Sequence, residues 1–228
     1  MKNKEENKEE KQREQTFNKL TAKEWAVLSK NVWNDVSSPR EKRHVEHGAT
    51  FPEKLANRLI NMYSAPGDLI LDPFLGVGST LEACRNTKRG GIGIELNPRF
   101  VELARETLSQ KKLTSEPGIK VIQDDCRDIL KHVEKNSIQL MITSPPYANF
   151  IHKSVEDRKN THKTSLIKYA NRSSVKPYSE DKKDFGNLGY DGFLKEIESF
   201  MNKLFNVTKQ GGYNIWVVKD YRNTKSNI

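Results

Sequence analysis

Short apolar runs and stretches of helical periodicity alternate along the middle of the chain. Four runs are typical of buried strands and lie at residues 69–71, 91–96, 119–123 and 138–142. Between them, apolar positions recur at helical spacing in stretches that start at about residues 51, 79 and 98. Strands that alternate with helices predict a parallel, doubly wound α/β sheet.

The N-terminal region differs from this regular part. Residues 1–16 are almost entirely Lys, Glu, Asn, Gln and Arg, which predicts a disordered, charged arm. Residues 17–47 carry enough apolar side chains, Trp25 and Trp33 among them, to dock on the main domain as helix and loop. Pro39 and the charged residues after it break that pattern. We therefore expect one folded domain over residues 17–228.

The regular pattern stops after Tyr147 and returns near Tyr190. Residues 152–183 hold nine Lys or Arg against four Asp or Glu, so this basic insertion is either a functional loop or a disordered segment. A helix from Tyr190 to about Val207, a turn at Gly211-Gly212 and a strand over residues 213–218 are expected to follow.

Composition favours a polyanionic partner. The chain has 228 residues, a formal net charge of +9 and 30% charged residues, a balance that suits nucleic acid without proving it. The two cysteines, Cys84 and Cys126, offer neither a disulfide framework nor a metal-binding spacing. No stretch approaches the roughly 18 apolar residues of a membrane span, and the N-terminus lacks the apolar core of a signal peptide. We expect a soluble, cytoplasmic protein without a membrane partner.

A rigid polar and aromatic corner follows the run at 138–142. Pro145 and Pro146 fix the backbone and remove two donors, which leaves carbonyls available to accept hydrogen bonds. Ser144 adds an acceptor and Tyr147 adds a flat face. Such a site suits a planar base with an exocyclic amino group, so these four residues are the candidate catalytic residues.

A glycine-rich segment follows the run at 69–71. The strand ends in Asp72, a turn contains Gly76 and Gly78, and a helix begins after it, so backbone N–H groups can approach a nucleotide-like ligand. The segment lacks the Gly-Lys-Ser/Thr of a phosphate loop, and Leu81 replaces the third glycine of a dinucleotide fingerprint. Glu95, at the next strand end, can take both hydroxyls of a ribose, and a third acid follows the third strand. These acids predict a ligand-binding rim.

Together these segments resemble motifs of the S-adenosylmethionine-dependent DNA amino-methyltransferases of restriction-modification systems, which modify cytosine N4 or adenine N6. The segments at 72–80, 93–98 and 143–147 are similar to motifs I, II and IV, and residues 47–53 are similar to motif X. The resemblance implies a Rossmann-like methyltransferase sheet, the cofactor S-adenosylmethionine, and double-stranded DNA with a flipped target base as partner.

By the same resemblance, residues 72–80 hold the amino-acid end of the cofactor, Glu95 its ribose and Asp125 its adenine. The cofactor-binding residues implied are Phe51, Pro52, Asp72, Pro73, Phe74, Gly76, Gly78, Ser79, Thr80, Glu95, Leu96 and Asp125. The basic insertion is expected to contact DNA phosphates through Lys153, Arg158, Lys159 and Lys163.

The reaction expected is transfer of a methyl group to a base amine held in line with it, without a covalent nucleophile. Neither cysteine follows a proline at a strand end, which argues against methylation of cytosine C5. Ser144 in place of Asp favours cytosine N4 over adenine N6 within the family. An RNA or protein methyltransferase of the same fold, or a nucleic-acid-binding subunit without catalysis, stays open as an alternative.

Two features depart from the family pattern. The motif order X, I, II, III, IV is circularly permuted relative to most relatives with Ser-Pro-Pro-Tyr. The family's sheet usually continues beyond the strand expected at 213–218, so we expect a sheet that lacks its last strands, with an exposed edge. Either the chain is a fragment, or a second polypeptide completes the sheet and the recognition domain.

Overall fold

The structure is a computed structural model that describes residues 11, 16–109, 118–146, 181 and 184–218. Five strands form one sheet in this part of the chain: β1 (Leu69–Asp72), β2 (Gly90–Glu95), β3 (Ile119–Gln123), β4 (Ile138–Thr143) and β5 (Thr208–Trp216). Their order is β3-β2-β1-β4-β5 and all pairings are parallel. The predicted parallel, doubly wound sheet is therefore confirmed.

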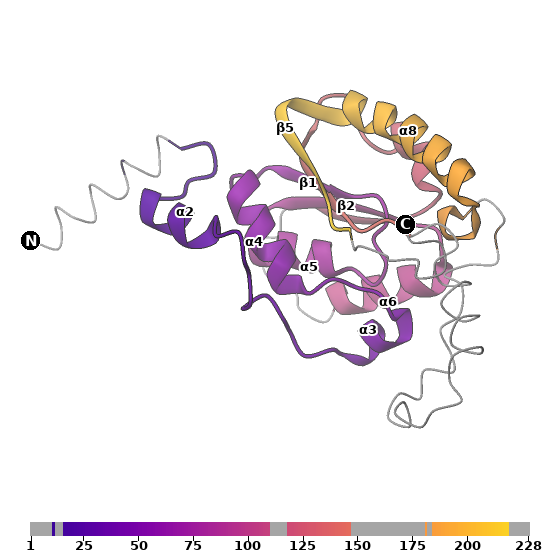
Figure 1. The fold of residues 1–228 in the computed structure, drawn as a ribbon, viewed down its shortest axis with the longest axis horizontal. Coiled ribbons are helices and arrows are strands. Elements are labelled where there is room, and N and C mark those ends of the chain that lie inside the picture. The colour runs from indigo at the N-terminus through magenta and orange to yellow at the C-terminus, as the bar shows by residue number, and fades with distance from the viewer. Residues whose placement is uncertain (1–10, 12–15, 110–117, 147–180, 182–183, 219–228) are drawn as a thin grey trace, which may run out of the picture.

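Helices cover both faces of the sheet (Figure 1). The main helices are α2 (Ala22–Leu28), α3 (Lys42–His47), α4 (Glu53–Tyr63), α5 (Ser79–Asn86), α6 (Pro98–Ser109) and α8 (Tyr190–Val207). The described residues also form two short 3-10 helices: η1 (Cys126–Lys131) follows β3, and η2 (Phe185–Asn187) precedes α8. Helices α4, α5 and α6 pack on one face, and α8 with η1 packs on the other. None of the helices described is long and apolar enough to cross a membrane.

The order in which strands are added to the sheet reverses at β1. The path leads from β1 outward through β2 to β3 and then returns to β4 on the other side of β1. In open α/β sheets, the crevice at the carboxyl ends of the strands beside such a reversal is where ligands bind. The fold therefore predicts the position of a site before any side chain is considered.

Two local expectations were wrong. The Gly211-Gly212 pair does not form a turn between helix and strand, because α8 ends at Val207 and β5 begins at Thr208. The glycines lie within β5, where its register against β4 shifts, and Gly211 has a φ of +75°. The charged residues that were expected only to interrupt the apolar pattern after Pro39 lead into a helix, α3, in which Arg43 is buried. Most of the arm at 1–16 and of the insertion at 152–183 lies outside the described residues.

Candidate active site

One cleft opens at the carboxyl ends of β1, β2 and β4, and it holds about 870 Å³ of empty space, part of it open to solvent. Eleven of the predicted site residues line it: Phe51, Pro73, Phe74, Gly76, Ser79, Glu95, Leu96, Asp125, Ser144, Pro145 and Pro146. Pro52, Asp72, Gly78 and Thr80 do not line it. Tyr147, Lys153, Arg158, Lys159 and Lys163 lie outside the described residues, so their roles stay predictions.

Glu95 fixes the glycine turn at the cleft wall. Its Oε2 accepts a hydrogen bond from the backbone N–H of Gly76 at 2.8 Å, and its Oε1 accepts from the N–H of Asn97 at 2.8 Å. Burial raises the pKa of Glu95 to about 7, although these two backbone N–H groups act in the opposite direction. Each carboxylate oxygen has a second lone pair, so the group can also accept hydrogen bonds from a ligand.

Asp72 lies beneath the cleft. The carboxyl group is almost fully buried and accepts hydrogen bonds from the hydroxyls of Thr80, at 2.5 Å, and Thr143, at 2.7 Å. Burial raises the pKa of Asp72 to about 6, while the two hydroxyls and the N–H of Phe74 lower it. The prediction placed Asp72 on a ligand-binding rim, whereas the structure makes it the link between the ends of β1 and β4 and the start of α5.

Gly78 also acts away from the cleft. It precedes α5 in the left-handed region at φ +96°, and a Cβ added there would come within 3.2 Å of the Ala104 Cβ on α6. The absent side chain therefore permits the packing of α6, and the expected close approach of a ligand at Gly78 stays a prediction. Gly76 differs, because its position faces the cleft and a Cβ there would lie 2.8 Å from His47 Nε2.

The start of α5 carries an unusual polar group. The Ser79 hydroxyl is buried at the cleft wall and makes no hydrogen bond within the described residues. No described side chain caps this helix N-terminus, so its first backbone N–H groups face the same region with a partial positive charge. A buried hydroxyl of this kind is costly unless something bonds to it. This end of the cleft is therefore suited to the carboxylate of a ligand.

The N-terminal segment completes the same wall. Arg43 on α3 donates to the carbonyl of Val77 at 3.1 Å and to Glu82 Oε2 at 2.5 Å. This anchor places His47, at the end of α3, against Phe100, with ring centroids 4.5 Å apart. Burial lowers the pKa of His47 to about 4, so its ring is neutral at physiological pH. Residues 47–51 thus reach the cleft through an ion pair that the sequence analysis did not identify.

Ser144, Pro145 and Pro146 form the acceptor corner, which is fixed by hydrogen bonds from the preceding residue to β1 and to the residue after β5. The Thr143 hydroxyl donates to Asp72, and the Thr143 carbonyl accepts from the Val217 N–H at 2.7 Å. Both bonds fix the chain direction immediately before Ser144, and Ser144, Pro145 and Pro146 then line the cleft. The structure therefore brings the serine and the two prolines to the cavity that also contains Glu95.

Asp125 lines the cleft, but a neighbouring cation engages it. The guanidinium of Arg127 donates to both carboxylate oxygens of Asp125, with Nε distances of 2.9 and 3.1 Å. Burial alone would raise the pKa of Asp125, but the hydrogen bonds from Arg127 outweigh burial and lower it. An Asp125 contact to an adenine amino group therefore has to share these oxygens with Arg127.

Sequence reasoning missed several residues of the cleft wall, and two of them belong to a segment that it had not assigned to the site. Asp184 and Phe185 enter it from η2, on the segment that leads into α8. Phe185 packs against Phe74 and Phe200 in T-shaped contacts, and the Arg127 guanidinium lies 5.3 Å from its ring centroid. The only available signals were an aromatic residue in a polar stretch and an Asp at a helix start. Neither signal indicates which cavity a segment will reach.

Several known proteins are similar in sequence to this chain. Residues 1–106 match the family model described as DNA methylase, which covers N6 and N4 methyltransferases. The Type II methyltransferase M.MthZI of Methanothermobacter thermautotrophicus is 37% identical over 99 residues, which are 41% of this chain and 28% of that protein. M.BglI of Bacillus subtilis is 36% identical over 92 residues, which are 40% of this chain and 26% of that protein.

A solved structure from Thermus thermophilus is described as a DNA modification methylase complexed with S-adenosyl-L-methionine. It is 32% identical to this chain, the match covers 50% of this chain and 41% of that one, and the TM-score is 0.39. The matches to the two Type II methyltransferases span less than a third of each of those proteins. These sequence matches confirm the predicted resemblance to the DNA amino-methyltransferases.

Proposed function

We propose that this chain, whose residues 1–106 match the DNA methylase family, transfers a methyl group from S-adenosylmethionine to an exocyclic amino group of a DNA base. One observation carries the proposal. A single cleft contains both the wall where Glu95 accepts a hydrogen bond from Gly76 and the corner formed by Ser144, Pro145 and Pro146. Methyl transfer needs the donor and the accepting nitrogen in one water-poor space, in line with each other.

The residues of the cleft fit the cofactor. The Ser79 hydroxyl, which makes no hydrogen bond within the described residues, and the N–H groups at the start of α5 suit the methionine carboxylate. The second lone pairs of Glu95 suit a ribose diol. Phe51, Phe74 and Phe100 give the cleft apolar walls for an adenine ring.

The mechanism assigns the chain a positioning role. S-adenosylmethionine, when bound, supplies a methyl group already activated by a sulfonium. Ser144 and the carbonyl of Pro145 accept hydrogen bonds from the base amine and so direct its lone pair toward that methyl group. The prolines hold this geometry rigidly. Tyr147, which lies outside the described residues, is proposed to stack on a base swung out of the duplex.

Within this function we propose cytosine N4 as the preferred acceptor and adenine N6 as the alternative. The proposal rests on Ser144, where an acid would favour adenine, and on the family resemblance. Double-stranded DNA is the proposed substrate, and the basic insertion at 152–183 is proposed to contact its phosphates.

The test is methyl transfer from radiolabelled S-adenosylmethionine to duplex DNA, RNA and protein, followed by mass spectrometry of the nucleosides. We expect label in DNA as 4-methylcytosine, and a large loss of label with Ser144→Ala at unchanged cofactor affinity. Label in N6-methyladenine contradicts the base preference alone. Label in RNA or protein, or cofactor binding with transfer to none of the three, contradicts the proposed function.

A further inference from the structure

Asp125 and Arg127 form a bidentate ion pair at the wall of the cleft. Asp125 directly precedes η1 and Arg127 belongs to it, and both residues line the cleft. Their position relative to Glu95 is fixed, because β2 and β3 pair in parallel with Glu95 opposite Gln123 and the Asp124 N–H donates to the Glu95 carbonyl at 3.2 Å. The pair is therefore adjacent to the proposed ribose site, on the side where the sequence analysis expects the adenine.

Both carboxylate oxygens of Asp125 are engaged by Arg127. Oδ1 accepts from the backbone N–H of Arg127 at 2.9 Å and from its Nε at 2.9 Å, while Oδ2 accepts from Nε at 3.1 Å and from Nη2 at 2.5 Å. A carboxylate offers about four lone-pair sites, so these contacts use its capacity. Hydrogen bonds between a guanidinium and a carboxylate are charge-assisted and roughly twice as strong as those between neutral groups. The amino group of an adenine, a neutral donor, would have to displace one of them.

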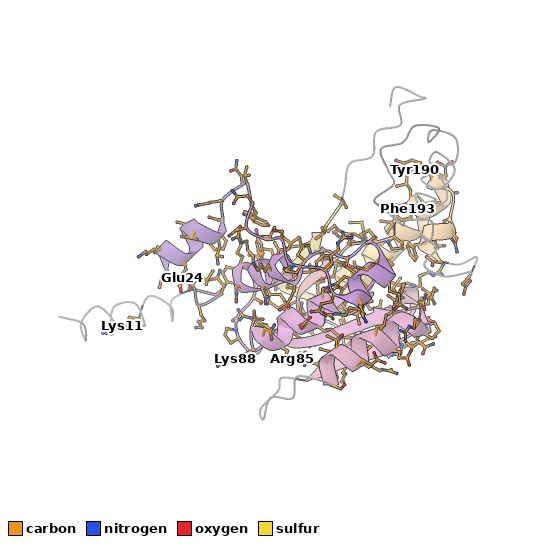
Figure 2. The ribbon with its side chains drawn as sticks, turned by 90° about the horizontal axis from the view of Figure 1, so that it is seen from below. Lys11, Glu24, Arg85, Lys88, Tyr190 and Phe193 are labelled. Carbon is orange, nitrogen blue, oxygen red and sulfur yellow. The ribbon has the colours of Figure 1, made fainter. Side chains whose placement is uncertain are left out.

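The Arg127 guanidinium is also supported by elements outside η1. It lies 5.3 Å from the ring centroid of Phe185 on η2, and its Nη1 lies 3.4 Å from Glu196 Oε2 on α8. Phe185 in turn packs edge-on against Phe193 in the first turn of α8, which Figure 2 shows at one end of the molecule, with ring centroids 6.3 Å apart. Moving the guanidinium away from Asp125 would therefore disturb contacts to two further elements.

An unpaired carboxylate would select strongly for the 6-amino group of a purine. The amino group donates hydrogen bonds, a carboxylate only accepts them, and a hydrogen bond to a charged group is worth roughly 10- to 100-fold in affinity. In this structure the guanidinium occupies the lone pairs of Asp125 and neutralises its charge. A base amine that binds here exchanges one hydrogen bond for another, and such an exchange contributes little net free energy.

We propose that Arg127 is a specificity-determining residue that makes the cofactor pocket insensitive to the 6-amino group of the purine. The inference rests on the proposed function, because it takes the ligand to be the nucleoside of S-adenosylmethionine. The pocket then recognises the nucleoside through its ribose at Glu95 and through the aromatic walls of the cleft. This assignment departs from the role that the family resemblance implies for Asp125.

Calorimetric titration of the full chain with two nucleosides tests this inference. The probes are S-adenosylhomocysteine and its 6-deamino analogue, in which hydrogen replaces the amino group, so the ratio of their Kd values isolates that group from every other contact. The wild type is expected to bind the two within about threefold of each other, which is the weak end of a net hydrogen bond. Arg127→Met frees the oxygens of Asp125 and is expected to favour S-adenosylhomocysteine by roughly 10- to 100-fold.

Three further variants make the ratio specific to this ion pair. Arg127→Lys keeps the charge but lacks the fork that engages both oxygens, so an intermediate ratio is expected, and this variant decides the question if Arg127→Met does not fold. Asp125→Ala/Arg127→Met removes the freed acceptor and is expected to return the ratio to the wild-type value. Lys131→Met is the matched control, because Lys131 lies on the same helix, pairs with Asp128 at 3.0 Å and does not line the cleft. Its ratio is expected to equal that of the wild type.

The possible results separate this inference from the proposed function. A wild type that binds S-adenosylhomocysteine about tenfold more tightly than the 6-deamino analogue overturns the inference, because Asp125 then recognises the amino group with Arg127 in place. An Arg127→Met variant with the wild-type ratio overturns it as well. Binding of neither nucleoside by the folded wild type contradicts the proposed function, and the inference fails with it. The expected ratios without methyl transfer to any substrate support the inference and contradict only the proposed reaction.

Discussion

Replacing Arg43 by Met is expected to destabilise the protein strongly. The side chains of Arg43 and Glu82 are 7% and 1% exposed and form an ion pair at 2.5 Å. Removing one partner of a buried pair typically costs about 3–5 kcal/mol, because a charge stays in a medium that solvates it poorly. For a chain of this size, such a loss lowers the melting temperature by very roughly 6–20 °C.

The assay is reversible unfolding in urea, followed by circular dichroism. Arg43→Met/Glu82→Leu is the informative second variant, since replacing both members of a buried pair by apolar residues is often close to neutral. It is expected to recover most of the lost stability. Arg99→Met is the matched control, because Arg99 pairs with Glu46 at the surface, and its effect is expected to be much smaller.

Two results would contradict this prediction: an Arg43→Met variant no less stable than Arg99→Met, or a double variant less stable than Arg43→Met alone. Either result would mean that water solvates the Arg43–Glu82 pair despite its burial. Because Arg43 also anchors α3 through Val77, Arg43→Met should in addition weaken cofactor affinity, measured by calorimetry below the melting transition.

Two further predictions concern the cleft. Gly76→Ala should weaken cofactor affinity, because the new Cβ would lie 2.8 Å from His47 Nε2 and the backbone has a φ of +56°. Adding His47→Ala should recover the affinity lost to the clash with His47, but not the affinity lost to backbone strain. Unchanged calorimetric affinity for Gly76→Ala would contradict this. The raised pKa of Glu95, about 7 against an ordinary 4.5, means that the folded protein retains a proton that the unfolded chain has lost. Stability of the cofactor-free protein should therefore fall as pH rises between these values and then level off, and Glu95→Gln should remove part of that fall. A fall of the same size in Glu95→Gln, measured by urea titration across this range, would exclude Glu95 as its source.

The sequence predicted most of the regular elements. The helix expected from Tyr190 and the strand at 119–123 have those bounds in the structure, because each has a clear apolar periodicity and a distinct start. The Gly211-Gly212 turn was wrong, because glycine is compatible with both a turn and an irregular strand, and only the pairing with β4 decides between them.

The site was predicted less completely, for a physical reason. Strand-end motifs indicated the wall that contains Glu95, because parallel strands place their carboxyl ends together. They did not separate Asp72, which lies below the surface, from Glu95, which faces the cleft. That difference depends on how far each side chain extends and on partners such as Thr143, which is distant in sequence. The approach of Asp184 depends on the path of the segment before α8, and local periodicity does not determine such a path.

The Asp72 carboxyl group ties the two halves of the cleft together. One oxygen binds the hydroxyl at the start of α5, on the donor side, and the other binds Thr143, directly before the acceptor corner. The spacing between the start of α5 and the corner at Ser144 is therefore set by a brace inside the sheet and not by loops at the surface. The wall formed by residues 47–51 is attached separately, through the short helix α3 and its buried Arg43–Glu82 pair.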